Sequence, residues 1–506
     1  MSYHRGASSD AVHSDDAEPG IKVEAEDEKT QDDAGQLDSE VHDPDIVDWD
    51  GPDDPQNPRN WTGPAKLAHV VLVSAFTLYS NLAAVMFAPS ALDLVAEFAI
   101  TDTVVASLTV SIYLLGFAIG PLLISSLSET YGRLVIYHLC NIFYLGFTVG
   151  CALSNGTAMF LVFRFLCGCA ASSPMSIGGG TIADLYKAEE RGKAMALFGL
   201  GPLVGPVVGP VIGGFVSQSL SWRWTFWVIL IFAGLVSAIA LMVMRETYEP
   251  VLLQCKATEM REATGNTRLR ARTADKDLPP REVLRRAVIR PTKMLIFSPI
   301  ILLLSTYCAF MFGLIYLLFT TFPGVFGETY GFGPGISGLV YLGLGVGMIL
   351  SIGLFGKLSD KLLHQPRGGR VARPELRLVL MMWSCPLVPV GFFWYGWSAE
   401  SHTHWIVPIL GTSLIGLTAF MLLMPAQLYL VDAFGTEGAA SALAANTVLR
   451  SLFGALLPLA GPPLYSALGL GWGNSLLAFI ALAFVPIPWL FFKFGERLRA
   501  RFPVTY

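Results

Sequence analysis

Twelve long apolar runs limit what this 506-residue chain can fold into. A membrane span needs about 20 mostly apolar residues. A backbone in lipid must also satisfy its own hydrogen bonds, so runs of this length cross as helices. The sequence therefore predicts an all-α membrane protein with twelve transmembrane helices. Their approximate limits are 67–89, 103–127, 134–153, 158–180, 194–217, 222–244, 296–321, 335–356, 376–396, 405–428, 439–461 and 472–494.

Composition and charge divide the chain into five predicted units. With 53% apolar and 14% charged residues, the chain is too apolar for an ordinary soluble protein. Residues 1–60 are acidic and poor in apolar side chains, which predicts a disordered cytoplasmic segment. The other units are a six-helix bundle at 61–244, a basic cytoplasmic loop at 245–295, a second six-helix bundle at 296–494 and a short basic cytoplasmic tail at 495–506.

Lysines and arginines gather in the loops that follow even-numbered spans. Cytoplasmic loops of membrane proteins retain such positive charge. Examples are Lys187, Arg191, Lys357 and Lys361, whereas the loops on the other side hold only Arg223, at the edge of a span. Both termini are therefore predicted to be cytoplasmic.

The fifth apolar run combines glycine and proline at an unusual density. In lipid its backbone stays helical, so glycines spaced by four residues form a groove that a neighbouring helix can approach closely. The prolines remove backbone donors and allow bending. We interpret the run as a packing surface that flexes, with a plain packing helix as the alternative. Its residues are Gly201, Pro202, Gly205, Pro206, Gly209, Pro210, Gly213 and Gly214.

Two charged turns occupy equivalent places in the two halves. The turn after the second span places Glu129 four residues before Arg133, with Gly132 between them. The turn after the eighth span carries Asp360 in the sequence GKLSDK. Matching turns support an internal duplication, and their charges can pair with helix ends and part when the halves move. A solvated polar turn is the alternative for either piece alone.

A series of motifs follows the chain in a specific order. They include NPRNW at 57–61, LSETYGR at 127–133, LVFRFLCG at 161–168, SWRWTFW at 221–227, RETYEPVLL at 245–253, YLVDAF at 429–434 and ASALAANTVLRS at 440–451. In this order they resemble the major facilitator superfamily, and within it the fungal twelve-span drug:proton antiporters. The resemblance implies a transporter of two rocking bundles that exports cargo in exchange for protons. Separately, we expect the plasma membrane rather than the vacuolar membrane. The first charged turn has one arginine where relatives often have two, and its second-half counterpart is degenerate.

Two ionisable residues lie well inside the predicted spans, Arg164 in the fourth and Arg450 in the eleventh. An ionised group in a membrane is costly, so each should face a central cavity or the carbonyls of a neighbouring helix. The resemblance associates the fourth-span arginine with proton coupling. A structural hydrogen-bond hub is the alternative for Arg164, and for Arg450 a hub and a contact with cargo are equally open.

The charge inventory bears on cargo and on proton coupling. A polycation would need carboxylates at membrane depth, and none is present there, so a lipophilic neutral or weakly acidic compound fits better. Candidate cavity-lining residues are Asn81, Tyr113, Tyr307, Tyr316, Tyr341, Gln427, Tyr429 and Asn446. Peripheral proton carriers are Asp93, Glu129, His138, Asp184 and Asp432. Asp184 and Asp432, at the inner ends of the fourth and tenth spans, are the best placed, although they could equally pin helix ends.

The sequence thus predicts a secondary active exporter of a drug, toxin or secondary metabolite. It contains no G-x-x-x-x-G-K-[ST] loop for ATP, no nucleophile–base set of an enzyme and no metal-ligand cluster. Neither a cofactor nor nucleic acid is expected, and the expected partners are a small molecule, protons and the bilayer, with the protein acting as a monomer. The alternatives are a proton-linked or facilitative importer of a nutrient, polyamine or siderophore, and a non-transporting membrane sensor.

Overall fold

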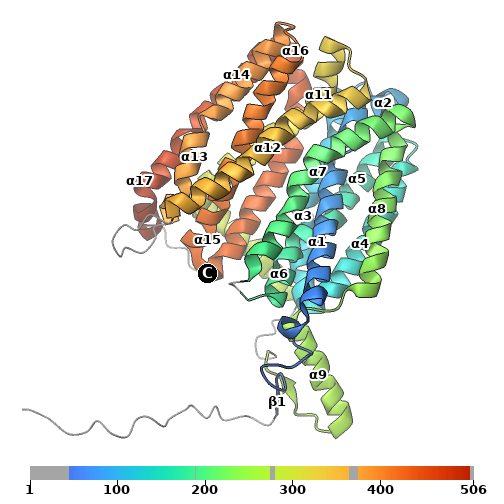
Figure 1. Ribbon diagram of the computed structural model, residues 1–506, viewed down its shortest axis with the longest axis vertical. Coiled ribbons are helices and arrows are strands. Elements are labelled where there is room, and N and C mark those ends of the chain that lie inside the picture. Colours follow the sequence, from blue (N-terminus) through green and yellow to red (C-terminus); the bar gives the residue numbers. More distant parts are fainter. Residues whose placement is uncertain (1–44, 188–189, 274–279, 364–373, 502–506) are drawn as a thin grey trace, which may run out of the picture.

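The computed structural model describes residues 45–187, 190–273, 280–363 and 374–501, and these are almost entirely helical. Two groups of helices lie side by side, the first coloured blue to green and the second yellow to red (Figure 1). We call the end of the bundle beside α9 (Glu249–Thr264) the α9 end, and the opposite end, beside α2 (Ala91–Glu97), the far end.

Each half consists of long helices with short interruptions. The first half contains α1 (Gly63–Val85), the 3₁₀ turn η2 (Ala88–Ser90), α2, α3 (Thr103–Tyr131), α4 (Arg133–Ala152), α5 (Thr157–Ala171), α6 (Ser173–Leu185), α7 (Arg191–Ser219) and α8 (Trp222–Val243). The second half contains α11 (Pro299–Tyr330), α12 (Pro334–Leu363), η4 (Pro374–Leu378), α13 (Val379–Ser384), α14 (Leu387–Glu400), α15 (Ile406–Leu456), η5 (Leu457–Ala460), α16 (Gly461–Phe484) and α17 (Pro486–Arg501).

Eleven helical segments of the described chain are long and apolar enough to cross a membrane. The last runs from Gly438 to Arg499 and has 62 residues, so it contains both the eleventh and the twelfth predicted spans. At about 1.5 Å per residue it is roughly three times as long as the hydrocarbon core is thick. Gly469, with φ +72°, breaks the helical path, and α16 packs along α14. The segment therefore folds back and crosses twice, which gives twelve crossings.

The helices run beyond the apolar limits predicted for them. The seventh span was predicted at 296–321, but α11 continues to Tyr330, because hydrogen bonding persists until Gly331 takes a left-handed conformation (φ +69°). The fourth predicted span is broken at Ser172, where α5 gives way to α6, and the ninth at Cys385, before α14. Helix ends depend on capping and backbone geometry, which hydropathy does not encode.

The glycine groove predicted in α7 receives α1. Methyl groups added at Gly201 and Gly205 would each lie 2.8 Å from a backbone nitrogen of α1, and at Gly209 the Leu82 carbonyl oxygen would be 3.0 Å away. At Gly213 the added carbon would collide with the Met86 carbonyl oxygen. The close packing predicted from the glycine spacing is therefore present. The three prolines lie within one continuous helix, and bending of α7 stays a prediction.

The two halves meet closely toward the far end. The backbone N–H of Gly335 in α12 donates to Gln218 Oε1 in α7 at 3.0 Å. A methyl group at Gly338 would collide with the Pro210 carbonyl oxygen, and one at Gly345 would collide with the Val207 side chain. In addition, α3 packs on α15, and η2 contacts both α11 and α12. Helix α7 of the first half and α12 of the second therefore pack closely at positions where α12 has glycine.

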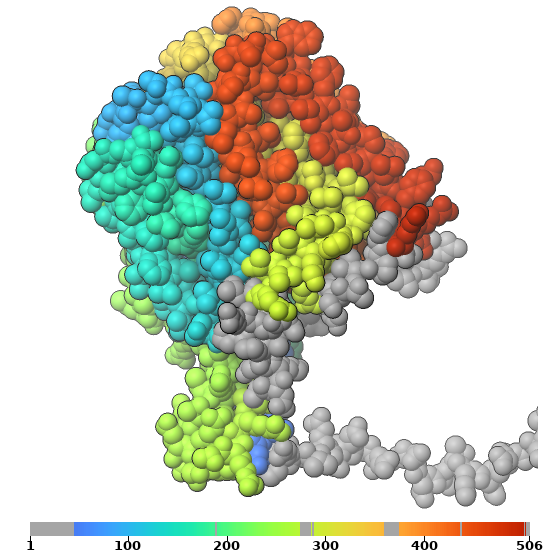
Figure 2. All heavy atoms as spheres, turned by 180° about the vertical axis from the view of Figure 1, so that it is seen from behind, coloured from blue at the N-terminus to red at the C-terminus, as the bar shows by residue number. Residues whose placement is uncertain are grey.

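The segment 245–295, expected to be a basic loop, is largely helical. It contains α9 and α10 (Pro280–Phe297). The second of these contacts α3 in the first half and α15 in the second, and it crosses the boundary between the halves in yellow-green in Figure 2. The connection between the bundles therefore includes a helix, α10, that contacts both halves at the α9 end.

Part of the segment predicted to be disordered is ordered. Residues 1–44 lie outside the described residues, but the strand β1 (Ile46–Val47) pairs in parallel with β2 (Arg270–Ala271). Val47 joins a small apolar cluster with the α9 side chain Leu253. Lys256 Nζ lies 2.8 Å from Asp50 Oδ1 and 3.3 Å from Asp54 Oδ2. Residues 45–60 thus dock on α9, and no local sequence pattern predicts these contacts.

Replacing Lys256 with methionine should loosen this docked segment. Burial alone would raise the pKa of Asp54, but hydrogen bonds from the Asp50 and Gln56 backbones and the Lys256 ammonium outweigh it and lower that pKa. Loss of the ammonium should cost the local unit about 1–3 kcal/mol. Hydrogen exchange of residues 45–60 measures the change, with Lys293→Met, at an exposed lysine, as control.

Because the folded-state pKa of Asp54 is depressed, its contribution is complete above the unfolded pKa and is lost as pH falls through the folded pKa. Relative to the intrinsic exchange rate of unprotected amides at each pH, the protection of residues 45–60 in the wild-type protein should therefore fall in acid, and the variant should show less of this fall. Equal exchange rates in Lys256→Met and wild type would contradict the docking contacts.

Candidate functional site

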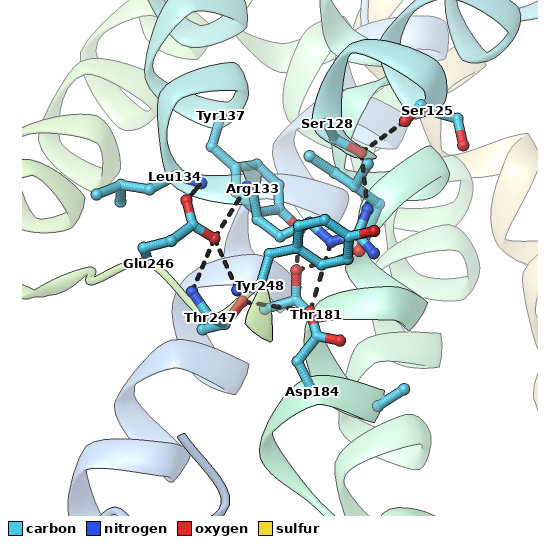
Figure 3. Close-up of polar contacts among 12 residues, drawn as sticks. Ser125, Ser128, Arg133, Leu134, Tyr137, Thr181, Asp184, Glu246, Thr247 and Tyr248 are labelled. Carbon is cyan, nitrogen blue, oxygen red and sulfur yellow. Dashed lines mark hydrogen bonds and ion pairs between the residues drawn. The ribbon is translucent and has the colours of Figure 1, made fainter. Parts of the chain in front are cut away.

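A polar cluster joins three segments of the first half at the α9 end (Figure 3). Gly132, with φ +92°, makes the tight turn from α3 to α4 and places Arg133 at the start of α4. Arg133 Nη1 donates to Ser128 Oγ at 2.7 Å, and its Nε lies 3.4 Å from Asp184 Oδ2 at the end of α6. The guanidinium also lies over the Tyr248 ring, 4.6 Å from its centroid. Arg133 thereby ties α3, α6 and the segment after α8 together.

The carboxylate of Glu246 caps the start of α4. It accepts the backbone N–H groups of Arg133 and Leu134 at 3.0 Å each, and those of Thr247 and Tyr248 at 2.8 Å each. Helix N-termini leave their first N–H groups unpaired and favour negative charge. Sequence reasoning placed Glu246 in a family motif but assigned it no site. The available signal was an acid directly after the sixth span.

Replacing Glu246 with glutamine should destabilise the first half. The neutral amide keeps one acceptor oxygen but loses the charge at the helix N-terminus, at a cost of about 2 kcal/mol. The melting temperature of the purified protein measures this loss, and Glu259→Gln, at an exposed acid of α9, is the matched control. A Glu246→Gln protein as stable as the control would show that the cap contributes little.

The second half carries a related arrangement. Arg377 Nε lies 2.9 Å from Asp432 Oδ2, and Arg499 Nη1 lies 2.9 Å from Glu375 Oε1. In both halves, therefore, the start of the third membrane span contacts the end of the fourth span and the segment at the end of the sixth span. The contact with the sixth span differs in charge between the halves. In the first half this segment supplies a carboxylate, from Glu246, and in the second half it supplies a guanidinium, from Arg499. Each half is clamped within itself at the α9 end.

The predicted turn residues take different places in these clamps. Gly132, Arg133, Asp184 and Asp432 are all part of them. Glu129 is exposed and forms no ion pair with any residue that the structure describes, so Asp184, and not Glu129, is the partner of Arg133. The side chain of Asp360 lies outside the described residues.

Arg164 forms a hub between α5 and the last turn of α1. Its side chain is 1% exposed, and Nη1 and Nη2 donate to the carbonyls of Ala83 and Ala84 at 3.1 and 3.3 Å. Carbonyls in the last turn of a helix lack intrahelical partners and favour positive charge. The guanidinium also lies over the Tyr113 ring at 4.7 Å. The arginine therefore fixes the point at which α1 ends and η2 begins.

Arg450 has a different environment. Its guanidinium lies over the Phe312 ring at 4.8 Å, and its buried Nε has no hydrogen-bond partner among the described residues. Asn446, one helical turn earlier, is 2% exposed, and both its Oδ1 and its Nδ2 are unpaired within the described chain. Both arginines have a buried Nε without a partner in the described chain, but Arg164 donates from Nη1 and Nη2 to carbonyls, whereas Arg450 donates to no described residue.

Most of the candidate lining residues are packing residues in this structure. The Tyr113 hydroxyl donates to the Ser80 carbonyl at 2.9 Å, and that of Tyr341 to the Phe319 carbonyl at 2.6 Å. Tyr307 stacks on Phe484. The remaining candidates are Tyr316, packed on Phe312, Tyr429, packed on Phe491, Asn81, bonded to Thr77 of its own helix, and Gln427, which is half-buried. A hydropathy pattern cannot distinguish such positions from cavity walls.

A further ion pair at the far end was not predicted. Arg223 Nη1 lies 2.7 Å from both carboxylate oxygens of Glu97, and Trp222 Nε1 donates to the same carboxylate at 2.7 Å. Because Arg223 Nη2 also donates to the Ser154 carbonyl, this cluster ties α2, α8 and the turn after α4. The sequence offered only a lone arginine at a span edge.

A family model described as the Major Facilitator Superfamily matches residues 71–458. The chain belongs to this superfamily. The predicted fold class, an all-helical membrane protein of two bundles, and the resemblance to fungal transporters of this superfamily are confirmed. As a superfamily member the chain is a transporter and not an enzyme.

Relatives of this superfamily member are similar over almost their whole length. The MFS transporter prlG of a fungal species (strain NRRL 50135) is 75% identical over 468 residues, which cover 92% of this chain and 99% of the relative. The trichosetin biosynthesis cluster MFS transporter of Gibberella fujikuroi is 52% identical over 490 residues, covering 96% and 95%. The crystal structure of the D-xylose-proton symporter shares the fold, with a TM-score of 0.63, 16% identity and coverage of 84% and 99%.

Proposed function

We propose that this superfamily member exports small lipophilic compounds, neutral or weakly acidic, by alternating access and in exchange for protons. The observation that carries the proposal is the pattern of contacts: each half is clamped within itself at the α9 end, while the halves meet through α7 and α12 toward the far end. Two internally rigid bodies that pack closely along α7 and α12 are suited to rocking against each other.

The distribution of positive charge supports an orientation for these bodies. Lys187, Arg191 and Lys193 gather at the α9 end, which we place in the cytoplasm together with both termini. In that orientation the far end faces outward, and its close α7–α12 contact corresponds to a form closed to the outside. We assign the protein to the plasma membrane.

The nature of the relatives and the interior charges support the class of cargo. One relative is named for a biosynthesis cluster, so a secondary metabolite of the producing fungus is a fitting cargo here. The ionised groups deep within the described spans are Arg164 and Arg450, both cationic. A polyamine would be repelled there, whereas a neutral or acidic lipophilic compound would not.

Proton exchange would use the clamp carboxylates. Asp184 and Asp432 each lie within an ion pair that protonation of the carboxylate would weaken, releasing Arg133 or Arg377. Binding of a proton would in this way weaken the ion pairs at the α9 end of one half, and that half could then move more easily. Both carboxylates lie near the end that we place in the cytoplasm.

Transport into everted membrane vesicles tests direction and coupling together. In these vesicles the cytoplasmic face is outside, so an exporter that exchanges protons should accumulate lipophilic dyes when the lumen is acidic, and a protonophore should stop accumulation. Dye uptake that ignores the protonophore would refute proton exchange but not export. Transport only in the opposite direction would favour an importer, and no transport of any dye would favour a sensor.

A further inference from the structure

We propose that Arg450 and Asn446 form a binding subsite for the anionic head of the cargo, so that the exported compound is a lipophilic organic acid held in its ionised form. This inference deepens the proposed function and rests on it, because it assigns the cargo's charge and the residues that recognise it. The two residues lie four positions apart on α15 and therefore on one face of that helix.

The guanidinium of Arg450 is not satisfied by the protein. It contacts the face of Phe312 and makes no hydrogen bond to a residue in the described ranges, and its Nε is buried. Arg164 shows what a structural arginine in this fold looks like, with two carbonyl partners at a helix end. Arg450 is half-buried, and a guanidinium with a buried N–H and no protein acceptor is costly, so we infer that a ligand supplies the missing acceptor.

Asn446 supplies the second, independent observation. It is 2% exposed, yet neither its amide nitrogen nor its amide oxygen has a hydrogen-bond partner within the described structure. The thiol of Cys308 interacts with the Asn446 amide and lies near Arg450, but a thiol is at best a weak hydrogen-bonding group and leaves the amide without a strong partner. Each unpaired buried polar group destabilises the fold, because it loses its hydrogen bonds to water without replacing them. Arginine and asparagine, unpaired together on one helical face, indicate a shared ligand.

The chemistry of the unpaired atoms defines that ligand. Arg450 offers N–H donors in a planar fork, and Asn446 offers one amide donor and one acceptor. A carboxylate or another ionised acidic oxygen satisfies the donors, and an adjacent O–H or N–H of the same molecule satisfies the acceptor. The described chain provides no carboxylate partner for Arg450, so such an anion would meet no competing acid.

The apolar surroundings fit the remainder of a lipophilic acid. Phe312 packs against Tyr316 at 4.9 Å between ring centroids, on the side of α11 that faces Arg450. Gly454, one turn after Arg450, is bordered by Phe312 and by Leu114 of α3 in the other half. Tyr316 is also within electrostatic reach of both Arg450 and Arg164. The subsite therefore lies at the boundary between the halves, where alternating access brings cargo.

Equilibrium binding of a matched pair of probes tests the subsite. Full-length protein in lipid nanodiscs is mixed at neutral pH with tritiated naphthaleneacetate, an ionised acid, or with naphthaleneacetamide, its neutral counterpart, and empty nanodiscs give the background. The wild-type protein should bind the acid above background and more tightly than the amide. Equal binding of both probes, or no specific binding of the acid, would overturn the proposal.

Four variants locate the binding. Arg450→Gln and Asn446→Leu should each weaken binding of the acid by about tenfold or more, since each removes hydrogen bonds to a charged group. Arg450→Lys, which keeps the charge, should bind better than Arg450→Gln, and Arg268→Gln, at an exposed arginine, should bind like wild type. If Arg450→Gln does not fold, binding of the acid by Asn446→Leu and Arg450→Lys decides whether the subsite exists. Wild-type affinity in folded Asn446→Leu and Arg450→Gln would refute the subsite.

The binding assay needs no gradient and reports no direction, so it can fail separately from the proposed function. Specific acid binding that depends on Arg450, with no export from vesicles, would sustain the subsite and refute the exporter. Export of neutral dyes by a protein that does not bind the acid would sustain the exporter and refute the subsite.

Discussion

Replacing Arg164 with alanine is expected to abolish efflux, while the protein still reaches the membrane. The change leaves the Ala83 and Ala84 carbonyls unpaired at the end of α1 and removes a cation from the ring of Tyr113. The turn η2, which begins just beyond these carbonyls, contacts α11 and α12 of the other half. Loss of the hub should therefore disturb the junction between the halves at the far end, and efflux should fall by at least about tenfold.

Two further substitutions show whether the effect is specific to this side chain. Arg164→Lys keeps the positive charge but lacks the fork that reaches two carbonyls, so it should retain only part of the efflux. Arg268→Ala removes an exposed arginine and should leave efflux unchanged. Efflux rates are compared at equal amounts of protein in the membrane. Normal efflux by Arg164→Ala would remove this hub from the mechanism.

Replacing Gly213 with alanine is expected to cause the largest loss of stability among the α7 glycines. The added methyl group collides with the carbonyl oxygen of Met86, the residue that follows α1, and a backbone atom cannot move aside as a flexible side chain can. Overpacking costs about 1–3 kcal/mol when neighbours can adjust, and more is expected here. The melting temperature and the amount of folded protein should both fall, and efflux should fall with them.

The same helix offers a matched control. Gly199 also lies in α7, but a methyl group there meets no atom within 4 Å. Gly199→Ala should keep wild-type stability and efflux, or gain slightly, because alanine favours helix more than glycine does. If both variants behaved alike, the groove between α1 and α7 would not be a close packing surface.

The helical architecture could be predicted because apolar runs of membrane length have few ways to fold. What hydropathy could not supply was where helices end and break. Gly331 ends α11 nine residues beyond the apolar limit set at 321, and Gly469 turns one 62-residue segment back on itself. Both depend on a single backbone conformation, which an averaged pattern does not record.

The docking of residues 45–60 could not be predicted for a different reason. Their strand partner, Arg270–Ala271, lies far away in the sequence, and two-residue strands leave no periodic pattern. An acidic, polar composition predicts disorder when the segment is considered alone. The positive charge of Lys256, contributed by α9, changes that balance.

The sequence singled out several residues of the candidate site, but it did not show which of them contact each other. Arg133 was identified from the matching charged turns of the two halves, and Asp184 and Asp432 were identified as candidate proton carriers at the inner ends of spans. Which acid meets which base depends on how helices distant in sequence pack together, so the sequence could not show that Asp184 is the partner of Arg133. Glu246 was missed because its role comes from four backbone N–H groups, which have no sequence signature.

The difference between Arg164 and Arg450 was also beyond the sequence. Both are lone arginines in apolar runs, and periodicity places each on a helix without showing what faces it. Carbonyls at the end of α1 accept hydrogen bonds from Nη1 and Nη2 of Arg164, whereas Phe312 and Asn446 adjoin Arg450, which donates to no described residue. This contrast, visible only in three dimensions, separates a structural hub from a proposed cargo contact.

A disulfide across the far end tests the central claim, that two halves rock against each other during transport. Gln218 Oε1 and Gly335 N are 3.0 Å apart, so Gln218→Cys and Gly335→Cys place two thiols at the α7–α12 contact. Replacing the exposed Cys255 with serine limits side reactions. Oxidation should reduce efflux to background, and reduction of the disulfide should restore it. Undiminished efflux from protein shown by mass spectrometry to be fully cross-linked would contradict the account.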